Sequence, residues 1–142
     1  MDSRIESRVG IHADSEVIWN IVTDLDGWSR WNPYETEVTG AIAFGAAIRL
    51  TERLPGLPER FAAHGVAEWQ PLAQLVLVEK RGWLFNTVRY IEIEELARGN
   101  CIVANGVIFS GLRGELFHDK HRKAIKAAYA EIGENLRKLA EG

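Results

Sequence analysis

The 142-residue sequence contains a single cysteine, Cys101. One thiol cannot form an intramolecular disulfide or supply the several cysteines of a structural zinc site. We therefore expect a reducing, cytoplasmic location and an inert core thiol. Long apolar runs are also missing: none approaches the roughly 20 residues of a membrane span, and residues 1–14 lack the apolar core of a secretion signal. We expect no stable membrane insertion.

Neither sign of charge dominates the sequence. Lys and Arg together number 17 against 20 Asp and Glu, which gives a formal net charge of -3. Nucleic-acid binding would need a clustered basic face, which this balance does not indicate, so we expect no nucleic-acid partner. The sequence also lacks a Ser-His-Asp pattern, a Gly-rich phosphate loop and a nucleotide motif. No motif specifies a reaction or a cofactor.

A chain of this length fits one domain, residues 1–142. Residues 4–13 alternate between apolar and polar side chains, which predicts a first strand. Residues 15–24 carry apolar side chains at helical spacing, and Asp14 or Ser15 can supply the N-cap. A short amphipathic helix is therefore expected after the first strand.

Between residues 34 and 111 the pattern changes to apolar segments separated by turn residues. Six strands are expected, at residues 35–41, 46–54, 61–70, 74–81, 87–96 and 101–110. The breaks between them are too short for crossover helices, so the pattern favours an antiparallel meander.

After Gly114 apolar side chains recur at helical spacing to the end of the chain, among them Phe117, His121, Ile125 and Tyr129. This pattern predicts one helix of about 25 residues, or ~37 Å. A curved sheet with one apolar face needs a cover, and only this helix is long enough to cross it. The sequence thus predicts an α+β fold: a curved seven-stranded antiparallel sheet wrapped around a long C-terminal helix, with a short helical segment after the first strand.

The stretch VIWNIVTDLDGWSRWNPY, residues 17–34, resembles the START-related superfamily, also called SRPBCC. Its Val-x-Trp, Thr-Asp pair and Trp-Asn-Pro are similar to that family's approach to the second strand. Supporting stretches are Gly40, Gly45, ERLPG (52–56), FSG (109–111) and ENLRKLAE (134–141). The resemblance, which includes polyketide cyclase/dehydrase-like bacterial proteins, implies the helix-grip fold with a cavity between sheet and helix. Because the family includes cyclases, lipid carriers, receptors and co-chaperones, function has to be argued from the site.

Trp28 and Trp31 lie where the chain turns from the short helix into the sheet. Large rings at this corner can fill the end of the cavity while Pro33 fixes the direction of the following strand. We therefore expect these tryptophans to pack rather than to bind a ligand, with Trp31 at the cavity end.

Arg89 is the first polar candidate for a ligand site. If Ile91 and Ile93 face the cavity, strand alternation puts Arg89 on the same face. A guanidinium buried there needs an acidic partner or an anionic ligand group. The alternative, which we favour, places Arg89 near the strand end with its guanidinium in solvent.

Two further polar residues lie on predicted inward faces. His121 belongs to the stripe of the last helix, where we favour a histidine at the cavity rim over a general base. Asn105 shares a face with Val107 and Phe109. It fits a ligand anchor and a satisfied buried amide equally well.

Metal binding is not expected. His64 and Glu68 are predicted on one strand face, but ~13 Å apart, which is too far to share an ion. His118 and His121 are spaced to share a metal on a helix, but the pattern supplies no third or fourth ligand.

Three functions fit the sequence. The first is binding of a hydrophobic or amphipathic small molecule, a lipid or an aromatic polyketide-like compound, between the sheet and the C-terminal helix. The second is a polyketide cyclase/dehydratase-type enzyme using acid/base chemistry in the same cavity, and the third is a co-chaperone-like protein-interaction domain. A cavity of ~300 to 1,000 Å³ would favour the first two, and a filled core beside a large exposed apolar patch would favour the third.

The residues expected to contact a ligand are Trp31, Leu77, Arg89, Ile91, Asn105, Phe109, Phe117, His121, Ile125 and Tyr129. No catalytic residue is assigned and no metal or cofactor is expected. The expected partner is the hydrophobic small molecule, and the chain is expected to be a monomer or a weak homodimer.

Overall fold

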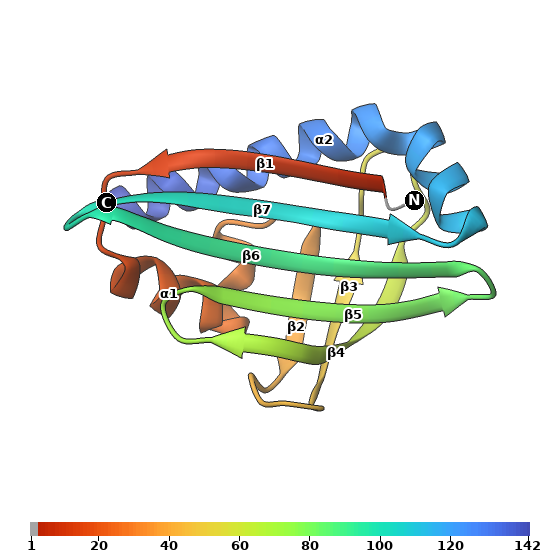
Figure 1. Ribbon diagram of the computed structural model, residues 1–142, viewed down its shortest axis with the longest axis horizontal. Helices are drawn as coiled ribbons and strands as arrows, with labels where there is room; N and C mark the ends of the chain where they lie inside the picture. Colours follow the sequence, from red (N-terminus) through yellow and green to blue (C-terminus); the bar gives the residue numbers. More distant parts are fainter. Residues whose placement is uncertain (1–2) are drawn as a thin grey trace.

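Seven strands form one antiparallel sheet in the order β1-β7-β6-β5-β4-β3-β2, and a long helix lies against it (Figure 1). The computed structural model describes residues 3–142, so residues 1–2 of the predicted domain lie outside the described residues. The elements are β1 (Ser3–Ile11), α1 (Ser15–Thr23), the 3-10 helix η1 (Leu25–Arg30), β2 (Glu35–Gly40), β3 (Ala47–Glu52), β4 (Arg60–Gln70), β5 (Gln74–Gly82), β6 (Phe85–Ala97), β7 (Asn100–Ser110) and α2 (Leu112–Glu141). This arrangement confirms the predicted helix-grip α+β fold.

The element bounds differ from the predicted ones in two places that matter for the site. Strand β6 begins at Phe85, two residues earlier than predicted, because Trp83 and Leu84 form a tight two-residue turn after β5. Helix α2 begins at Leu112 rather than after Gly114, directly behind Gly111, whose φ of 80° breaks the strand. Both changes bring the β5–β6 turn against the start of α2.

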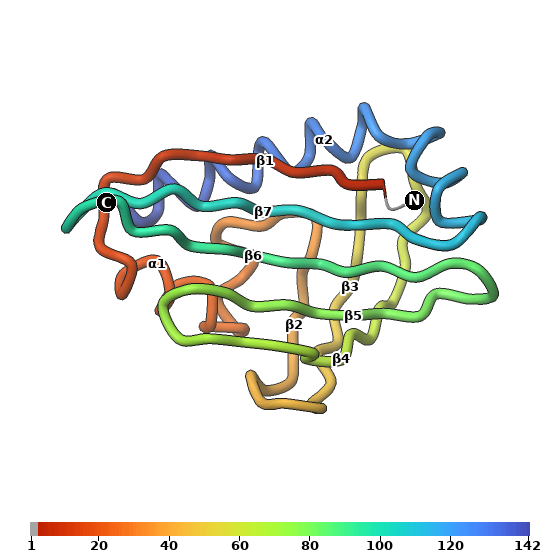
Figure 2. Tube along the Cα trace, in the orientation of Figure 1, coloured from red at the N-terminus to blue at the C-terminus, as the bar shows by residue number. Residues whose placement is uncertain are grey.

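The connection from β1 to β2 crosses the molecule, because these two strands are the opposite edges of the sheet. Helices α1 and η1 make this crossing and close one end of the interior, while α2 packs along β1, β7 and β6 (Figure 2). In the part of the chain that the structure describes, no helix is long and apolar enough to span a membrane.

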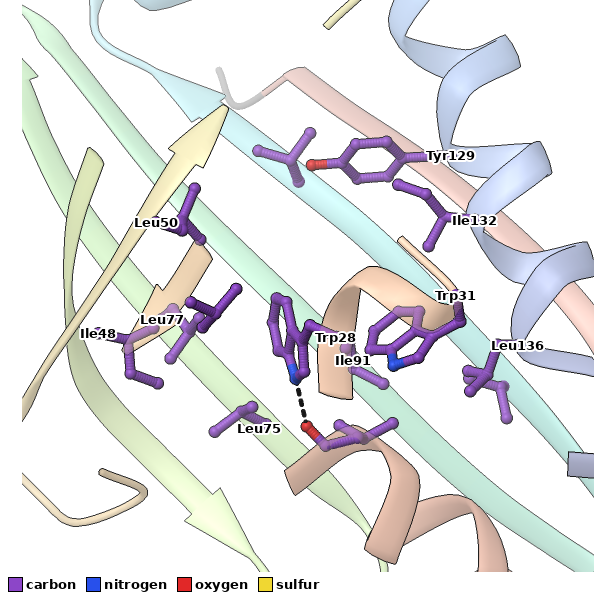
Figure 3. Close-up of a cluster of buried hydrophobic side chains, with 14 of the residues drawn as sticks. Trp28, Trp31, Ile48, Leu50, Leu75, Leu77, Ile91, Tyr129, Ile132 and Leu136 are labelled. Carbon is purple, nitrogen blue, oxygen red and sulfur yellow. Dashed lines mark hydrogen bonds between the residues drawn. The ribbon is translucent and has the colours of Figure 1, made fainter. Parts of the chain in front are cut away.

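Trp28 and Trp31 belong to the core, which confirms their predicted packing role. Their rings are 5.2 Å apart, and they are 0% and 1% exposed. The indole Nε1 of Trp28 donates a hydrogen bond to the carbonyl of Val22 at 2.7 Å, which ties η1 to α1 (Figure 3). The rings pack among apolar side chains of the sheet and of α2, including Ile48, Leu75, Leu77, Ile91, Ile132 and Leu136.

Candidate functional site

A buried ion pair lies on the inner face of the sheet. Arg89 is 2% exposed, and its Nη2 donates to Oε1 of Glu35 at 2.9 Å. Its Nη1 donates to the carbonyls of Tyr90 and Gly106 at 3.1 and 3.2 Å. The favoured expectation of a solvent-exposed guanidinium was therefore wrong. The earlier start of β6 at Phe85 places Arg89 well inside the strand, on the face that α2 covers.

Glu35 is held for this pairing by Asn32 of the Trp-Asn-Pro stretch. Nδ2 of Asn32 donates to Oε1 of Glu35 at 2.9 Å, and Oδ1 of Asn32 accepts the backbone N–H of Glu35 at 3.0 Å. Burial acts to raise the pKa of Glu35, but the charge and hydrogen bonds of Arg89 and the hydrogen bond from Asn32 outweigh it and lower the pKa. Glu35 is therefore a carboxylate at neutral pH.

A second charged cluster joins β3, β4 and β5 beside this pair. Both terminal nitrogens of Arg60 donate to the carboxylate of Glu79, at 2.7 and 3.0 Å. Its Nε donates to Oε2 of Glu52 at 3.1 Å. Arg60 thus has acidic partners on two strands, and its fork geometry fixes both carboxylates in place.

His64 lies between the two clusters without a hydrogen-bond partner of its own. Its side chain is 4% exposed, and within residues 3–142 neither ring nitrogen makes a hydrogen bond. The nearest carboxylate oxygen belongs to Glu79, 4.0 Å from Nδ1. Burial lowers the pKa of His64, while the charges of Glu35 and Glu79 act against this shift. A neutral imidazole there offers one donor and one acceptor, both unused.

The predicted placement of His64 and Glu68 on one strand face was wrong. The register between β4 and β5 shifts between Val66 and Glu68, and this irregularity puts His64 inside and leaves Glu68 exposed. Within the described residues, no group of three or more His, Cys, Asp and Glu is arranged to hold a metal ion.

A small polar cavity lies at the junction of these groups. Its volume is about 20 Å³, enough for one water-sized group and far below the ~300 Å³ or more of a typical ligand pocket. Its walls combine charged, polar and apolar side chains: Glu35, Glu52, Leu54, Arg60, His64, Arg81, Thr87, Arg89, Val107, Phe109, Ile125 and Tyr129. The interior is therefore nearly filled and is far smaller than the cavity expected for an interior ligand, and both polar and apolar side chains border the remaining space.

Tyr129 forms the wall of this cavity on the side of α2. Its ring extends from α2 over the sheet (Figure 3), and the guanidinium of Arg89 lies 4.6 Å from the ring centroid. Burial raises the pKa of Tyr129, so its hydroxyl stays protonated, and no hydrogen bond to that hydroxyl is present among residues 3–142. Asn105 supports the same turn of helix, because its Nδ2 donates to the carbonyl of Tyr129 at 3.2 Å while its buried Oδ1 stays unpaired.

A surface groove of about 300 Å³ lies beside the cavity at the start of α2. Arg81 separates the two spaces: it lines the cavity, and its guanidinium lies 4.5 and 4.8 Å from the rings of Phe85 and Phe117 in the groove. Arg81 forms no ion pair within the described part of the chain. The half-buried ring of His121 lies 4.6 Å from that of Phe117 and lines this groove rather than the cavity. One layer of side chains thus divides groove from cavity.

The residues predicted as ligand contacts fall into four groups. Arg89, Phe109, Ile125 and Tyr129 line the cavity, and Phe117 and His121 line the groove. Trp31, Leu77 and Ile91 belong to the surrounding core, and Asn105 lies behind Tyr129.

Sequence reasoning did not assign six polar residues that line the cavity. These residues are Glu35, Glu52, Arg60, His64, Arg81 and Thr87. The alternation of side chains along β4 and β5 could have placed some of them on the inner face. Arg60 and His64 share a face of β4 with the buried Ala62 and Val66. Arg81 shares a face of β5 with the buried Leu75 and Leu77, as does Glu79.

The fold agrees with comparisons to known proteins. Residues 3–141 match the family model for polyketide cyclase / dehydrase and lipid transport, so the chain belongs to this family of the START/SRPBCC superfamily. Among curated proteins, no sequence gives a significant match.

Several solved structures share this fold at low sequence identity to this chain. The di-domain ARO/CYC StfQ from the steffimycin biosynthetic pathway is 8% identical with a TM-score of 0.77, over 99% of this chain and 51% of StfQ. Major latex-like protein 151 from Panax ginseng is 10% identical with a TM-score of 0.77, over 99% of both chains. A START superfamily protein from Mycobacterium smegmatis is 16% identical with a TM-score of 0.66, over 94% of this chain and 98% of that one. At such low identity these likenesses establish the fold alone.

Proposed function

We propose that this chain binds a small amphipathic molecule, an aromatic polyketide-like compound or a lipid, through a polar oxygen group held in the cavity at His64. The observation that carries this proposal is a buried imidazole whose two nitrogens have no hydrogen-bond partner among residues 3–142. Leaving such a group unsatisfied costs ~1–3 kcal/mol, so a ligand hydroxyl or carbonyl placed there gains a hydrogen bond that the protein does not provide itself. The cavity volume of about 20 Å³ suits one group of this size.

The rest of the ligand needs more room than the cavity offers. The groove of about 300 Å³ supplies it once the layer formed by Arg81 and Phe117 moves aside, because these side chains separate the two spaces. Phe109 borders the cavity and lies 5.3 Å from Phe117 between ring centroids, so an apolar body passing from groove to cavity would contact aromatic rings along its path.

Tyr129 and Arg89 favour an oxygen-bearing ligand. The Tyr129 hydroxyl is protonated and has no partner within residues 3–142, so it can donate to a carbonyl or phenol oxygen in the cavity. The guanidinium of Arg89, which is paired with Glu35, lies 4.6 Å from the centroid of the Tyr129 ring and helps to hold that ring in place.

The same groups support acid/base chemistry of the cyclase or dehydratase type as a second candidate function. A neutral imidazole can accept a proton from a carbon next to a carbonyl, and the Tyr129 hydroxyl can donate a hydrogen bond to the oxyanion that forms. The lowered pKa of His64 favours this alternative, because it keeps the imidazole unprotonated and able to act as a base.

Native mass spectrometry of the purified protein, followed by chemical-shift perturbation with phenolic compounds and fatty acids, tests binding. We expect shifts at His64, Tyr129, Arg81 and Phe117. The exposed His12 supplies the control: His64→Asn should abolish the interior shifts and His12→Asn should leave them unchanged. Shifts confined to the outer surface for every compound class would refute the proposal.

A further inference from the structure

The β5–β6 turn and the start of α2 form one exposed apolar surface, the apolar tip, made of Trp83, Leu84, Leu112 and Leu116. Trp83 is 76% exposed, and Leu112 and Leu116 are each 60% exposed. Both segments lie at the same end of the molecule (Figure 1). Monomeric proteins keep such apolar groups scattered, so a cluster of this kind points to a binding surface.

Specific contacts hold the apolar tip together. The backbone N–H groups of Arg113 and Gly114 donate to the carbonyl of Leu84 at 3.0 and 3.2 Å, and Nη1 of Arg113 donates to the carbonyl of Trp83 at 3.2 Å. Gly111 permits this approach, since a β-carbon there would collide with the backbone of Leu84. The four apolar side chains are therefore presented on a fixed backbone.

The turn sequence is unusual for a tight hairpin. Two-residue turns favour Asn and Gly, which tolerate a positive φ and interact well with water. Here Trp83 and Leu84 occupy both turn positions, and Leu84 adopts a φ of 55°. Two large apolar residues thus stand at the point where local preferences favour small polar ones.

Positive charge is concentrated in the half of α2 that contributes to the apolar tip, although the chain as a whole is acidic. Residues 112–126 of α2 contain five Lys and Arg against two Asp and Glu, whereas residues 127–142 contain two against three. Lys80 lies on β5 just before the turn, and Lys120 lies in the adjoining groove. Cations next to exposed Trp and Leu match a surface that is negatively charged outside and apolar beneath.

From this arrangement we infer that the apolar tip docks on an anionic lipid bilayer, with Trp83, Leu112 and Leu116 entering the interface and the surrounding Lys and Arg contacting acidic headgroups. A protein partner fits less well, because the tip is a narrow turn and one helix end rather than a face of the ~800 Å² that stable protein partners usually bury on each side. Docking in this way would turn the groove at Phe117 toward the bilayer, but the inference does not depend on a ligand in the interior.

Sedimentation with lipid vesicles tests this inference. We expect the wild-type chain to bind vesicles of phosphatidylcholine mixed with phosphatidylglycerol, to release at high salt, and to stay in solution with phosphatidylcholine alone. Trp83→Ser and Leu116→Ser should each lower the partition coefficient at least about tenfold, because each removes an apolar side chain that the bilayer would bury. Phe61→Ser is the matched control: Phe61 is 80% exposed on β4, and its loss should change nothing.

The charge contribution is tested separately. Lys120→Gln should weaken binding to the mixed vesicles about fivefold, whereas Lys138→Gln near the other end of α2 should leave it unchanged. His64→Asn should bind vesicles like the wild type, which separates this inference from the proposed interior site. No vesicle binding, equal binding to neutral vesicles, or equal effects of Phe61→Ser and Trp83→Ser would overturn it.

Discussion

Nη2 of Arg89 and Oε1 of Glu35 lie 2.9 Å apart, and both side chains are only 3% exposed. The two residues are 54 positions apart in the sequence and join the middle of the sheet to the start of β2. A buried ion pair of this kind is often no more stable than a well-packed apolar pair of similar size. The pair lines the same cavity as His64, so we infer that it fixes the polar side of that cavity.

Removing one member of this pair should destabilise the protein strongly. We expect Arg89→Met to lower the free energy of unfolding by about 3–5 kcal/mol, because Glu35 is left as an uncompensated buried charge. The double variant Arg89→Met/Glu35→Leu should recover most of that loss. Urea denaturation measures both. The exposed ion pair of Arg53 and Glu37 is the control, and Glu37→Gln should cost no more than about 1 kcal/mol. A loss of about 1 kcal/mol or less for Arg89→Met would contradict the conclusion that Arg89 compensates the buried charge of Glu35.

Glu35 should also make stability depend on pH in the acid range. Its pKa is lower in the folded protein than the ~4.3 of an unfolded glutamate, so the unfolded chain binds more protons in this range. The stabilisation from Glu35 is therefore fully present above about pH 4.3 and is lost as the pH falls through the folded pKa. Unfolding free energies measured from neutral to acid pH should fall less steeply for Glu35→Gln than for the wild type. Parallel curves would contradict this assignment.

Gly106 should resist substitution for a steric reason. A β-carbon at Gly106 would collide with the hydroxyl end of Tyr90 and lie 2.8 Å from the carbonyl oxygen of Ile5. We expect Gly106→Ala to lower the melting temperature and to cost about 1–3 kcal/mol. Gly10 also lies in a strand but has open space where its β-carbon would be, so Gly10→Ala should change stability by about 0.5 kcal/mol or less. Equal effects of the two substitutions would rule out crowding as the cause.

The fold was predictable from the sequence because its periodic signals are long. The helical stripe through Ile125 and Tyr129 and the alternation through Arg89 and Ile91 gave α2 and the inner face of β6 correctly. The burial of Arg89 was missed, because its partner Glu35 lies on a strand that only the three-dimensional sheet brings within reach.

The site was less predictable than the fold, for local reasons. An irregular register in β4 changed the face of Glu68 relative to His64, and no pattern of alternation contains such a shift. The exposed turn at Trp83 and Leu84 has no typical turn residue, so the end of β5 and the start of β6 were placed too far apart. A monomeric or weakly dimeric state, cytoplasmic location and the absence of a nucleic-acid partner stay predictions.

Ligand binding should depend on the Tyr129 hydroxyl, which borders the cavity and has no hydrogen-bond partner in the described part of the chain. For a compound that shifts the interior resonances, we expect Tyr129→Phe to weaken binding up to about tenfold, the effect of one hydrogen bond. Tyr34→Phe is the control, because the Tyr34 hydroxyl is already bound to Glu131 outside the cavity. Isothermal titration measures both affinities. Equal affinities of Tyr129→Phe and wild type would show that the hydroxyl does not bind the ligand.

The most direct measurement of the central claim is the ring ¹⁵N spectrum of His64 during titration with such a compound. In the free protein we expect the signals of a neutral imidazole at neutral pH, because burial lowers its pKa. Ligand binding should move the His64 ring signals while those of the exposed His12 stay in place. Interior binding that leaves the His64 ring signals unchanged would contradict the account.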